Sequence, residues 1–159
     1  MKVTILAVGK LKEKYLKTGI SEYQKRLSRF CSLEIVEVED EKAPESLSEA
    51  GEAIVKQREG ERILKKLDER SKVIVLDIKG EKLDSVEFAR KIQSYMTLGS
   101  SSLIFVIGGS LGLDDEVIKK ADLRLSLSDM TFPHQLARLI ILEQIYRAFK
   151  IINNETYHK

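Results

Sequence analysis

Residues 103–114 read Leu103-Ile104-Phe105-Val106-Ile107-Gly108-Gly109-Ser110-Leu111-Gly112-Leu113-Asp114, an apolar run followed by a glycine-rich loop. This order predicts a buried strand that turns into a helix. Gly109 and Gly112 can adopt a positive φ or let a ligand approach the backbone, and Asp114 is placed to cap a helix over 115–120. Such turns often cradle nucleotide-type ligands, although usually after the first strand, so the late position is informative. A plain tight connection is the alternative.

The same alternation of apolar runs and longer helical patterns extends along all 159 residues. It predicts an α/β fold with a mainly parallel sheet, helices on both faces and a single domain over 1–159. The strands at 73–78 and 103–107 suit the centre of the sheet, and the acidic stretch from Glu37 to Glu41, continuing to Pro44, is expected to be an exposed loop. We predict strands at 1–8, 32–38, 73–78, 103–107 and 123–127, and helices at 12–30, 48–67, 84–98, 115–120 and 133–151.

Composition limits the classes of protein to which this chain can belong. Its hydrophobic content of 43% and charged content of 33% are typical of a soluble globular protein. No apolar run is long enough to span a bilayer and no secretory signal is apparent, so we expect a cytoplasmic protein without membrane contacts. The single Cys31 and two histidines have no metal-ligand spacing. We therefore expect no metal site, and an inert, partly buried Cys31.

Charge is distributed unevenly, although the net charge is only +2. Residues 1–30, 31–70 and 71–159 carry net charges of +6, −5 and +1. A local basic surface could therefore meet phosphates, and the alternative is the solvated face of an amphipathic helix. Its candidate members are Lys10, Lys12, Lys14, Lys17, Lys25, Arg26 and Arg29.

The last helix has Pro133 in its first turn, where the missing N–H has no cost. Its apolar residues cover more of the helix than one buried stripe requires, which implies a second buried face. We predict that a second copy of the chain covers that face in a homodimer, and a fully central core helix is the alternative. The apolar positions are Leu136, Ala137, Leu139, Ile140, Ile141, Leu142, Ile145, Tyr146 and Phe149.

Several common α/β functions lack their motifs here. The first strand ends in Gly9-Lys10-Leu11-Lys12 without G-x-G-x-x-G, which disfavours dinucleotide folds and Rossmann-like methyltransferases. No P-loop and no G-x-S-x-G elbow is present, and Asp77 stands alone where a phosphoacceptor domain needs clustered carboxylates. What remains is a ligand site built from late loops: the end of the third strand, the Gly108 loop and residues 126–132.

These late motifs closely resemble the ribosomal RNA large subunit methyltransferase H family, of the SPOUT class. The resemblance covers the whole chain and implies a homodimeric α/β-knot enzyme with a C-terminal trefoil knot. It further implies methyl transfer from S-adenosylmethionine to N3 of a pseudouridine in helix 69 of 23S rRNA, on assembled 70S ribosomes, with no DNA partner. The matching motifs are Gly108-Gly109-Ser110-Leu111-Gly112, Leu125-Ser126-Leu127-Ser128, Thr131-Phe132-Pro133-His134-Gln135-Leu136-Ala137-Arg138, Leu142-Glu143-Gln144-Ile145-Tyr146-Arg147-Ala148 and Tyr157-His158-Lys159.

The resemblance also implies which residues contact the cofactor. Leu76 and Leu127 can form apolar walls for adenine, and Gly108 admits the ribose or methionine part. Backbone groups of the loop over 127–132 can read the adenine edge. Without the family, Leu76 would be interpreted as a core strand residue. The remaining cofactor candidates are Ser128, Asp129, Met130, Thr131 and Phe132.

Methyl transfer depends mainly on positioning, and the proton on N3 calls for a base or a group that stabilises an anion. His134, Tyr157 and His158 are candidates, while Arg138, Arg147 and Lys159 can hold phosphate or an enolate-like oxygen. His134 and Arg138 lie one turn apart, although His134 can equally be an ordinary helix-start histidine. Arg147 is first interpreted as the ion-pair partner of Glu143.

The C-terminal residues would ordinarily be regarded as a frayed terminus. The resemblance instead implies that Tyr157 stacks on the target base while His158 and Lys159 engage the RNA. RNA binding and alignment are the expected roles of the tail, ahead of proton abstraction. A noncatalytic RNA-binding module and a small-molecule enzyme using the same late pocket are the competing functions.

Overall fold

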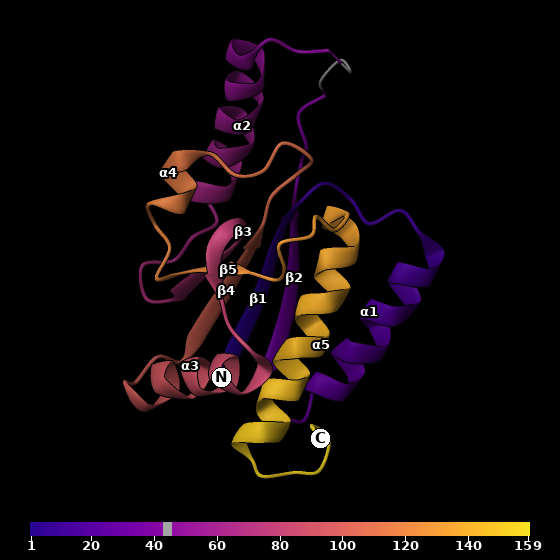
Figure 1. Ribbon diagram of the computed structural model, residues 1–159, viewed down its shortest axis with the longest axis vertical. Coiled ribbons are helices and arrows are strands. Elements are labelled where there is room, and N and C mark those ends of the chain that lie inside the picture. The colour runs from indigo at the N-terminus through magenta and orange to yellow at the C-terminus, as the bar shows by residue number, and fades with distance from the viewer. Residues whose placement is uncertain (43–45) are drawn as a thin grey trace.

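The computed structural model describes residues 1–42 and 46–159, so the predicted loop position of Pro44 lies outside the described residues. The chain forms an α/β fold with the predicted order of strands and helices (Figure 1). The strands are β1 (Lys2–Val8), β2 (Ser32–Val38), β3 (Lys72–Lys82), β4 (Ser102–Ile107) and β5 (Leu123–Ser126). The helices are α1 (Lys14–Leu27), α2 (Glu49–Leu64), α3 (Ser85–Thr97), α4 (Asp115–Ile118) and α5 (His134–Ile152).

The sheet has the strand order β2-β1-β4-β3-β5, and each neighbouring pair is parallel. The prediction of a mainly parallel sheet is therefore confirmed. β4 lies in the middle and β3 beside it, as the continuous apolar runs of both strands predicted, because a strand covered on both faces has no solvent side.

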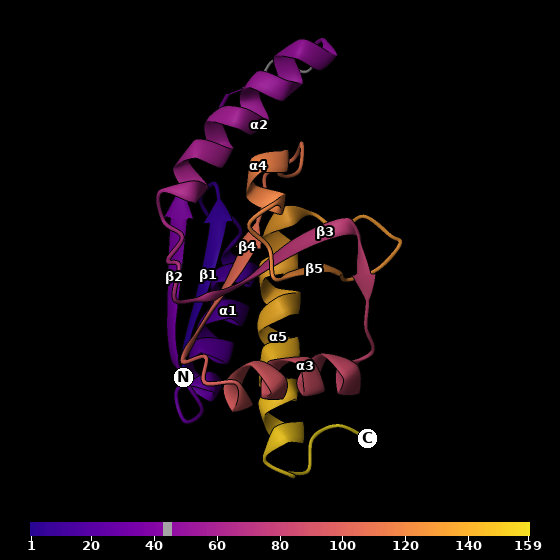
Figure 2. The same cartoon turned by 90° about the vertical axis from the view of Figure 1, so that its left-hand side faces the viewer.

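Helices cover both faces of the sheet, as predicted: α1, α3 and α5 lie on one face, and α2 and α4 on the other (Figures 1 and 2). Alternate residues of β1 serve the two layers, since successive side chains of a strand point to opposite faces. Ile5 belongs to the apolar cluster beneath α1, α3 and α5, whereas Leu6 belongs to the cluster beneath α2 and α4.

The helix α5 lies between α1 and α3, which accounts for much of its wide apolar surface within one chain. The rings of Phe30 and Phe149 stack with their centroids 5.6 Å apart, and Ile141 and Ile145 are fully buried. Ile140 remains only partly buried. The homodimer was predicted from the wide apolar surface of α5, and the rest of the same chain covers only part of that surface. The homodimer therefore stays a prediction.

The structure corrects several local predictions. β3 runs to Lys82 rather than ending at residue 78, because Glu81 and Lys82 resume pairing with β5 after a register shift. Pro133 precedes the helix as its N-cap with an extended ψ of 133°, so α5 begins at His134. Asp114 occupies the N-cap position of α4, but its side chain makes no capping hydrogen bond.

Two further sequence predictions concern the first half of the chain. The expected acidic loop is wrong for its first two residues: Glu37 and Val38 are in β2, and irregular backbone begins only at Glu39. Cys31 is buried rather than partly buried, and its burial raises the thiol pKa to about 11, which agrees with an inert packing role. None of the helices in 1–42 and 46–159 is long and apolar enough to cross a bilayer.

Candidate functional site

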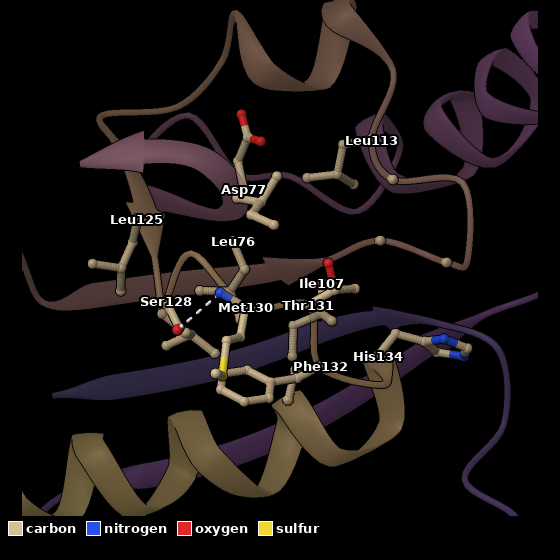
Figure 3. Close-up of a pocket in the computed structure, with 16 residues that line it drawn as sticks. Leu76, Asp77, Ile107, Leu113, Leu125, Ser128, Met130, Thr131, Phe132 and His134 are labelled. Carbon is tan, nitrogen blue, oxygen red and sulfur yellow. Dashed lines mark hydrogen bonds between the residues drawn. The ribbon is translucent and has the colours of Figure 1, made fainter. Parts of the chain in front are cut away.

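A cavity of about 150 Å³ lies at the carboxyl ends of β3, β4 and β5 (Figure 3). Carboxyl ends of parallel strands are where open α/β sheets commonly bind ligands. The cavity brings together seven of the eight residues assigned to the cofactor from the sequence: Leu76, Gly108, Leu127, Ser128, Met130, Thr131 and Phe132. The eighth, Asp129, is exposed and pairs with Lys82 outside the cavity.

The glycine-rich loop closes one side of this cavity as a tight turn. The Gly112 amide donates a hydrogen bond to the Gly109 carbonyl over 3.1 Å. Gly112 adopts a φ of +87°, as expected, whereas Gly109 is not among the residues with a positive φ. A Cβ atom on Gly108 would lie 3.0 Å from the carbonyl carbon and oxygen of Gly112. Gly108 is therefore required because two backbone segments come together there.

The loop over 127–132 forms the opposite wall and is held by its own serines. The Ser126 hydroxyl donates to the Ser128 carbonyl over 3.0 Å. The Met130 amide donates to the Ser128 hydroxyl, also over 3.0 Å (Figure 3). Such local bonds fix the backbone of a short loop. Met130 is 74% exposed, whereas Leu127 and Phe132 are partly buried. The loop thus presents backbone polar groups and apolar side chains to one small space.

Asp77 lies at the rim of the cavity, with its carboxylate pointing away from Leu76 (Figure 3). Burial opposes ionisation of this carboxyl group, but hydrogen bonds from Arg124 and the Lys79 amide outweigh it and lower the Asp77 pKa. Sequence reasoning treated Asp77 as isolated and missed Arg124. The signal was a charged residue in an otherwise apolar run, Leu123-Arg124-Leu125.

His134 lines the cavity from the first position of α5. Burial lowers the pKa of His134, and the positive charge of Arg138 lowers it further. The imidazole is therefore predominantly neutral at neutral pH, with one ring nitrogen free to accept a hydrogen bond.

Arg138 does not line the cavity; it is 1% exposed and binds backbone and side chain inside the protein. Its Nη1 donates to the Glu37 carboxylate over 2.6 Å, and its Nη2 donates to the carbonyls of Val8 and Gly9 over 3.1 and 2.6 Å. These bonds tie α5 to the ends of β1 and β2. Sequence reasoning missed Glu37 as the partner, because the two residues are 101 positions apart.

A second and larger hollow, which we call the acidic cleft, adjoins the cavity. It has a volume of about 720 Å³ and shares Gly109 and His134 with the cavity. Sequence reasoning missed this site and its most buried carboxyl group, Glu59. The signal in the sequence was a glycine, Gly60, inside a predicted helix. In the structure this glycine lets α2 approach Asp114, because a Cβ atom on Gly60 would lie 2.9 Å from the Cβ of Asp114. The cleft is lined mainly by Gly9, Lys10, Lys12, Glu37, Glu39, Asp40, Glu41, Glu59, Ser110, Leu111 and Gln135.

The C-terminal tail is folded onto α5 rather than frayed. The Tyr157 hydroxyl donates to Glu143 over 3.2 Å, and the Arg147 guanidinium lies 4.7 Å from the centre of the Tyr157 ring. Arg147 also pairs with Glu143 at 2.6 Å, which confirms the predicted ion pair, and contacts Nδ1 of His158 at 3.3 Å. Burial, followed by contacts with Tyr23 and Glu143, raises the Tyr157 pKa to about 12.

Within one chain, the tail and the cavity lie at opposite ends of α5 (Figure 1). The helix has 19 residues, which corresponds to roughly 28 Å at the usual rise of about 1.5 Å per residue. His134 is at its start, whereas Tyr157, His158 and Lys159 follow its end. A single chain therefore does not bring the predicted tail residues to the cavity.

Comparisons with known proteins match this chain over almost its whole length. The family model described as "Predicted SPOUT methyltransferase" matches residues 1–158. Proteins called "Ribosomal RNA large subunit methyltransferase H" from Acetivibrio thermocellus and Ruminiclostridium cellulolyticum are each 62% identical over 100% of both chains. The structure titled "a probable methylase family protein from Haemophilus influenzae" matches with a TM-score of 0.54 and 17% identity, covering 99% of this chain and 70% of that one. The last similarity concerns the fold alone.

Proposed function

Because this chain belongs to the SPOUT methyltransferase family, we propose that it methylates N3 of a pseudouridine in helix 69 of 23S rRNA on assembled 70S ribosomes. The names of its full-length relatives support a large-subunit rRNA substrate. The observation that carries the proposal is the cavity, which gathers the residues that the sequence resemblance assigns to the cofactor. Action on ribosomes would place the protein in the cytoplasm. The trefoil knot comes with this family.

The residues of the cavity fit S-adenosylmethionine. Leu76 and Leu127 provide apolar walls for the adenine, and the turn at Ser128 presents backbone groups to its polar edge. Gly108 allows the Gly112 backbone to approach closely, and this approach shapes one wall of the cavity. The cavity is smaller than the roughly 300–1,000 Å³ of typical ligand pockets. The cavity would therefore hold only part of the cofactor, and Leu76, Leu127 and Gly108 would contact its adenosine end.

Positioning provides most of the chemistry in this proposal. When bound, the cofactor supplies an electrophilic methyl group on a sulfonium. The protein has to align the acceptor nitrogen in line with that methyl group and exclude water, and such alignment contributes up to roughly 7–11 kcal/mol. The glycine turn and the 127–132 loop, both fixed by internal hydrogen bonds, keep this geometry rigid.

The tail enters the proposal through a second copy of the chain. Since α5 separates the tail from the cavity of its own chain, we place Tyr157, His158 and Lys159 beside the cavity of the other subunit in a homodimer. Antiparallel pairing of the two α5 helices about a two-fold axis would bring each tail to the partner's His134 end. Tyr157 would stack on RNA, and Arg147 and Lys159 would hold phosphates.

The exposed basic residues of α1 and its flanks extend this RNA surface. Each of the seven residues proposed from the sequence is exposed, which both the RNA surface and the solvated-face alternative require. Charge reversal at Lys12, Lys17 and Arg26 distinguishes the RNA surface from the solvated-face alternative. An RNA surface predicts weaker ribosome binding and a smaller dependence of that binding on salt.

The decisive experiment is transfer of labelled methyl from S-adenosylmethionine to 70S ribosomes that lack this modification. Separated subunits and naked 23S rRNA serve as parallel substrates. Label confined to N3 of a helix 69 pseudouridine in intact ribosomes supports the proposal. Cofactor binding without label on any of the substrates would direct attention to a small-molecule or different RNA substrate. Absence of cofactor binding would favour the noncatalytic RNA-binding alternative.

A further inference from the structure

The acidic cleft lies immediately beyond the mouth of the cofactor cavity. Gly109 and His134 line both hollows, so a group held in the cleft borders the region where the reacting end of the cofactor would lie. Its volume of about 720 Å³ falls within the roughly 300–1,000 Å³ of typical ligand pockets. The cleft is therefore large enough for a nucleotide in addition to any part of the cofactor that extends from the cavity.

Most of the carboxylates that line the cleft are either engaged elsewhere or exposed. Glu37 accepts hydrogen bonds from Arg138 and the Leu11 amide, and Glu41 pairs with Arg58 and Arg62. Glu39 and Asp40, the other two, are exposed to solvent.

Glu59 differs from all four. It is 5% exposed, and among residues 1–42 and 46–159 no basic side chain forms an ion pair with it. The Glu41 amide donates to its Oε2 over 3.0 Å, while its Oε1 receives no hydrogen bond from any described residue.

The position of Glu59 is fixed with respect to the glycine loop. A Cβ atom on Gly109 would lie 3.2 Å from Oε1 of Glu59 and 3.4 Å from Oε2. The carboxylate thus packs directly against the residue that separates the cleft from the cavity. This oxygen is not among the fully enclosed polar atoms that lack a partner, so it can be reached from the cleft. A donor from outside the chain can therefore bond to it, and the surrounding burial makes such a bond favourable.

We propose that the acidic cleft is the acceptor-nucleobase site and that Oε1 of Glu59 receives the proton of the base's imide N–H. The proposal rests on the proposed function and deepens it. A uracil-type ring has one N–H between two carbonyls, so a carboxylate acceptor beside the reacting methyl group matches that donor. Lys10 and Lys12, which also line the cleft, are placed to meet the phosphates of the same nucleotide.

The transfer balances with these groups alone. The N3 nitrogen forms a bond to the methyl carbon as the carbon–sulfur bond breaks, and the electron pair of that bond remains on sulfur. The N–H bond breaks with its electrons left on nitrogen, and the proton passes to the carboxylate of Glu59. The resulting carboxylic acid returns the proton to water after the product leaves.

Glu59 suits this role better than His134. Burial raises the pKa of Glu59, assisted by the charge of Asp40, which makes its carboxylate a stronger base than an exposed one. Burial and the adjacent Arg138 lower the pKa of His134, which weakens it as a proton acceptor. His134 is left to orient the base as a neutral hydrogen-bonding group.

The first test compares E59Q with E61Q in single-turnover methyl transfer to unmodified 70S ribosomes at saturating cofactor. The amide in E59Q keeps the shape of the side chain and can still accept from the Glu41 amide, but it cannot take up the proton. Glu61 is exposed on the same helix and serves as the matched control. We expect E59Q to lose about 10²- to 10⁴-fold in rate with unchanged cofactor affinity and melting temperature, and E61Q to match the wild type.

The second test needs neither cofactor nor turnover. Pseudouridine 5′-monophosphate and its N3-methyl analogue are titrated into the cofactor-free protein, with the amides of Gly109, Ser110 and Leu111 followed by NMR. We expect the N–H form to bind wild-type protein roughly tenfold more tightly than the methylated form, and this preference to vanish in E59Q.

Each alternative has its own outcome. An E59Q rate within threefold of wild type overturns the proposal. A rise in the cofactor dissociation constant of E59Q that accounts for the lost rate also overturns it, and would assign Glu59 to the cofactor's ammonium group instead. Equal binding of the two nucleotides by wild-type protein also overturns it, even if E59Q fails to fold. If wild-type protein methylates no ribosomal substrate, the proposed function fails, while the nucleotide titration still decides the role of the cleft.

Discussion

At the residue scale, Arg138 shows how burial changes the interpretation of a charged side chain. Next to His134 on a helix, it suggested a pair facing the active site. In the structure its guanidinium bonds to Glu37 and to the carbonyls of Val8 and Gly9 at the end of β1, so these donors are directed into the protein. Its contribution to activity is therefore expected to be indirect, through the position of α5.

Replacing Arg138 with alanine should destabilise the fold. The change leaves the Val8 and Gly9 carbonyls without their donor and Glu37 without its cation, and breaking a buried pair costs about 3–5 kcal/mol. We expect about 3 kcal/mol, because the Glu37 side chain is 36% exposed and partly hydrated. Urea unfolding measures the loss, with the exposed Arg90→Ala as control. A stable R138A that has lost only methyl transfer would instead make Arg138 a catalytic group.

His134 should make folding stability depend on pH. Its pKa in the folded protein is lowered by burial and by Arg138 from the usual 6.5. As the pH falls below about 6.5, the unfolded chain takes up this proton first, so stability decreases until the folded-state pKa is reached. The melting temperature should therefore fall less in H134Q than in wild type between about pH 7.5 and pH 5.5. Identical falls in both proteins would contradict this assignment.

At the element scale, the two loops of the cavity are held rigid by different means. The 127–132 loop uses serine hydroxyls, whereas the glycine loop depends on the absence of side chains where Gly108 meets the Gly112 backbone. A rigid cradle matters because binding energy is then not spent on ordering the loop.

Adding one methyl group at Gly108 should therefore impair cofactor binding. In G108A the new Cβ lies 3.0 Å from the backbone of Gly112, which has to move. We expect at least a tenfold rise in the S-adenosylmethionine dissociation constant, measured by calorimetry. The control is G99A, whose φ of +92° carries strain but whose Cβ meets no atom within 4 Å. G99A should lose about 1 kcal/mol of stability and keep cofactor affinity. Equal effects of the two variants on affinity would refute a specific role for Gly108.

At the scale of the whole molecule, the length of α5 separates the cavity from the tail. This separation is the physical argument for a site shared between two subunits. It also explains how a chain with a net charge of only +2 could present a concentrated RNA surface, since a dimer would bring the tail of one subunit to the cleft of the other.

Mixed dimers test this arrangement directly. At a cofactor concentration well below their raised dissociation constant, G108A chains should bind little cofactor, and Y157A/H158A chains should fail in RNA alignment. After unfolding and refolding an equal mixture, half of the dimers would contain one chain of each kind and one intact site. Activity should then recover to about a quarter of the wild-type value. No recovery, with heterodimers demonstrated by mass spectrometry, would show that each chain uses its own tail.

Much of this protein could be predicted from the sequence. Hydrophobic periodicity predicted the order of all ten elements and the parallel sheet, because the backbone geometry of strands and helices returns side chains to the buried face at periods of about 2 and 3.6 residues. The motifs around Gly108 and Thr131 identified most of the cavity lining, since both loops directly follow strands whose carboxyl ends meet. The errors in the elements, such as the start of α5, were confined to their ends.

Only the tertiary structure decided what the charged side chains do. Arg138 and Glu37 are 101 residues apart, and Glu59 meets Gly109 from another helix, so neither relation leaves a periodic trace in the sequence. Whether a charge is exposed, paired or buried alone depends on which segments the fold brings together. The sequence by itself therefore determined the elements and the loops that line the cavity. The fold assigned Arg138 to the interior, left Oε1 of Glu59 without a hydrogen bond from residues 1–42 and 46–159, and separated the tail from the cavity by the length of α5. Only the fold could decide these points, because burial and pairing are properties of three-dimensional neighbours.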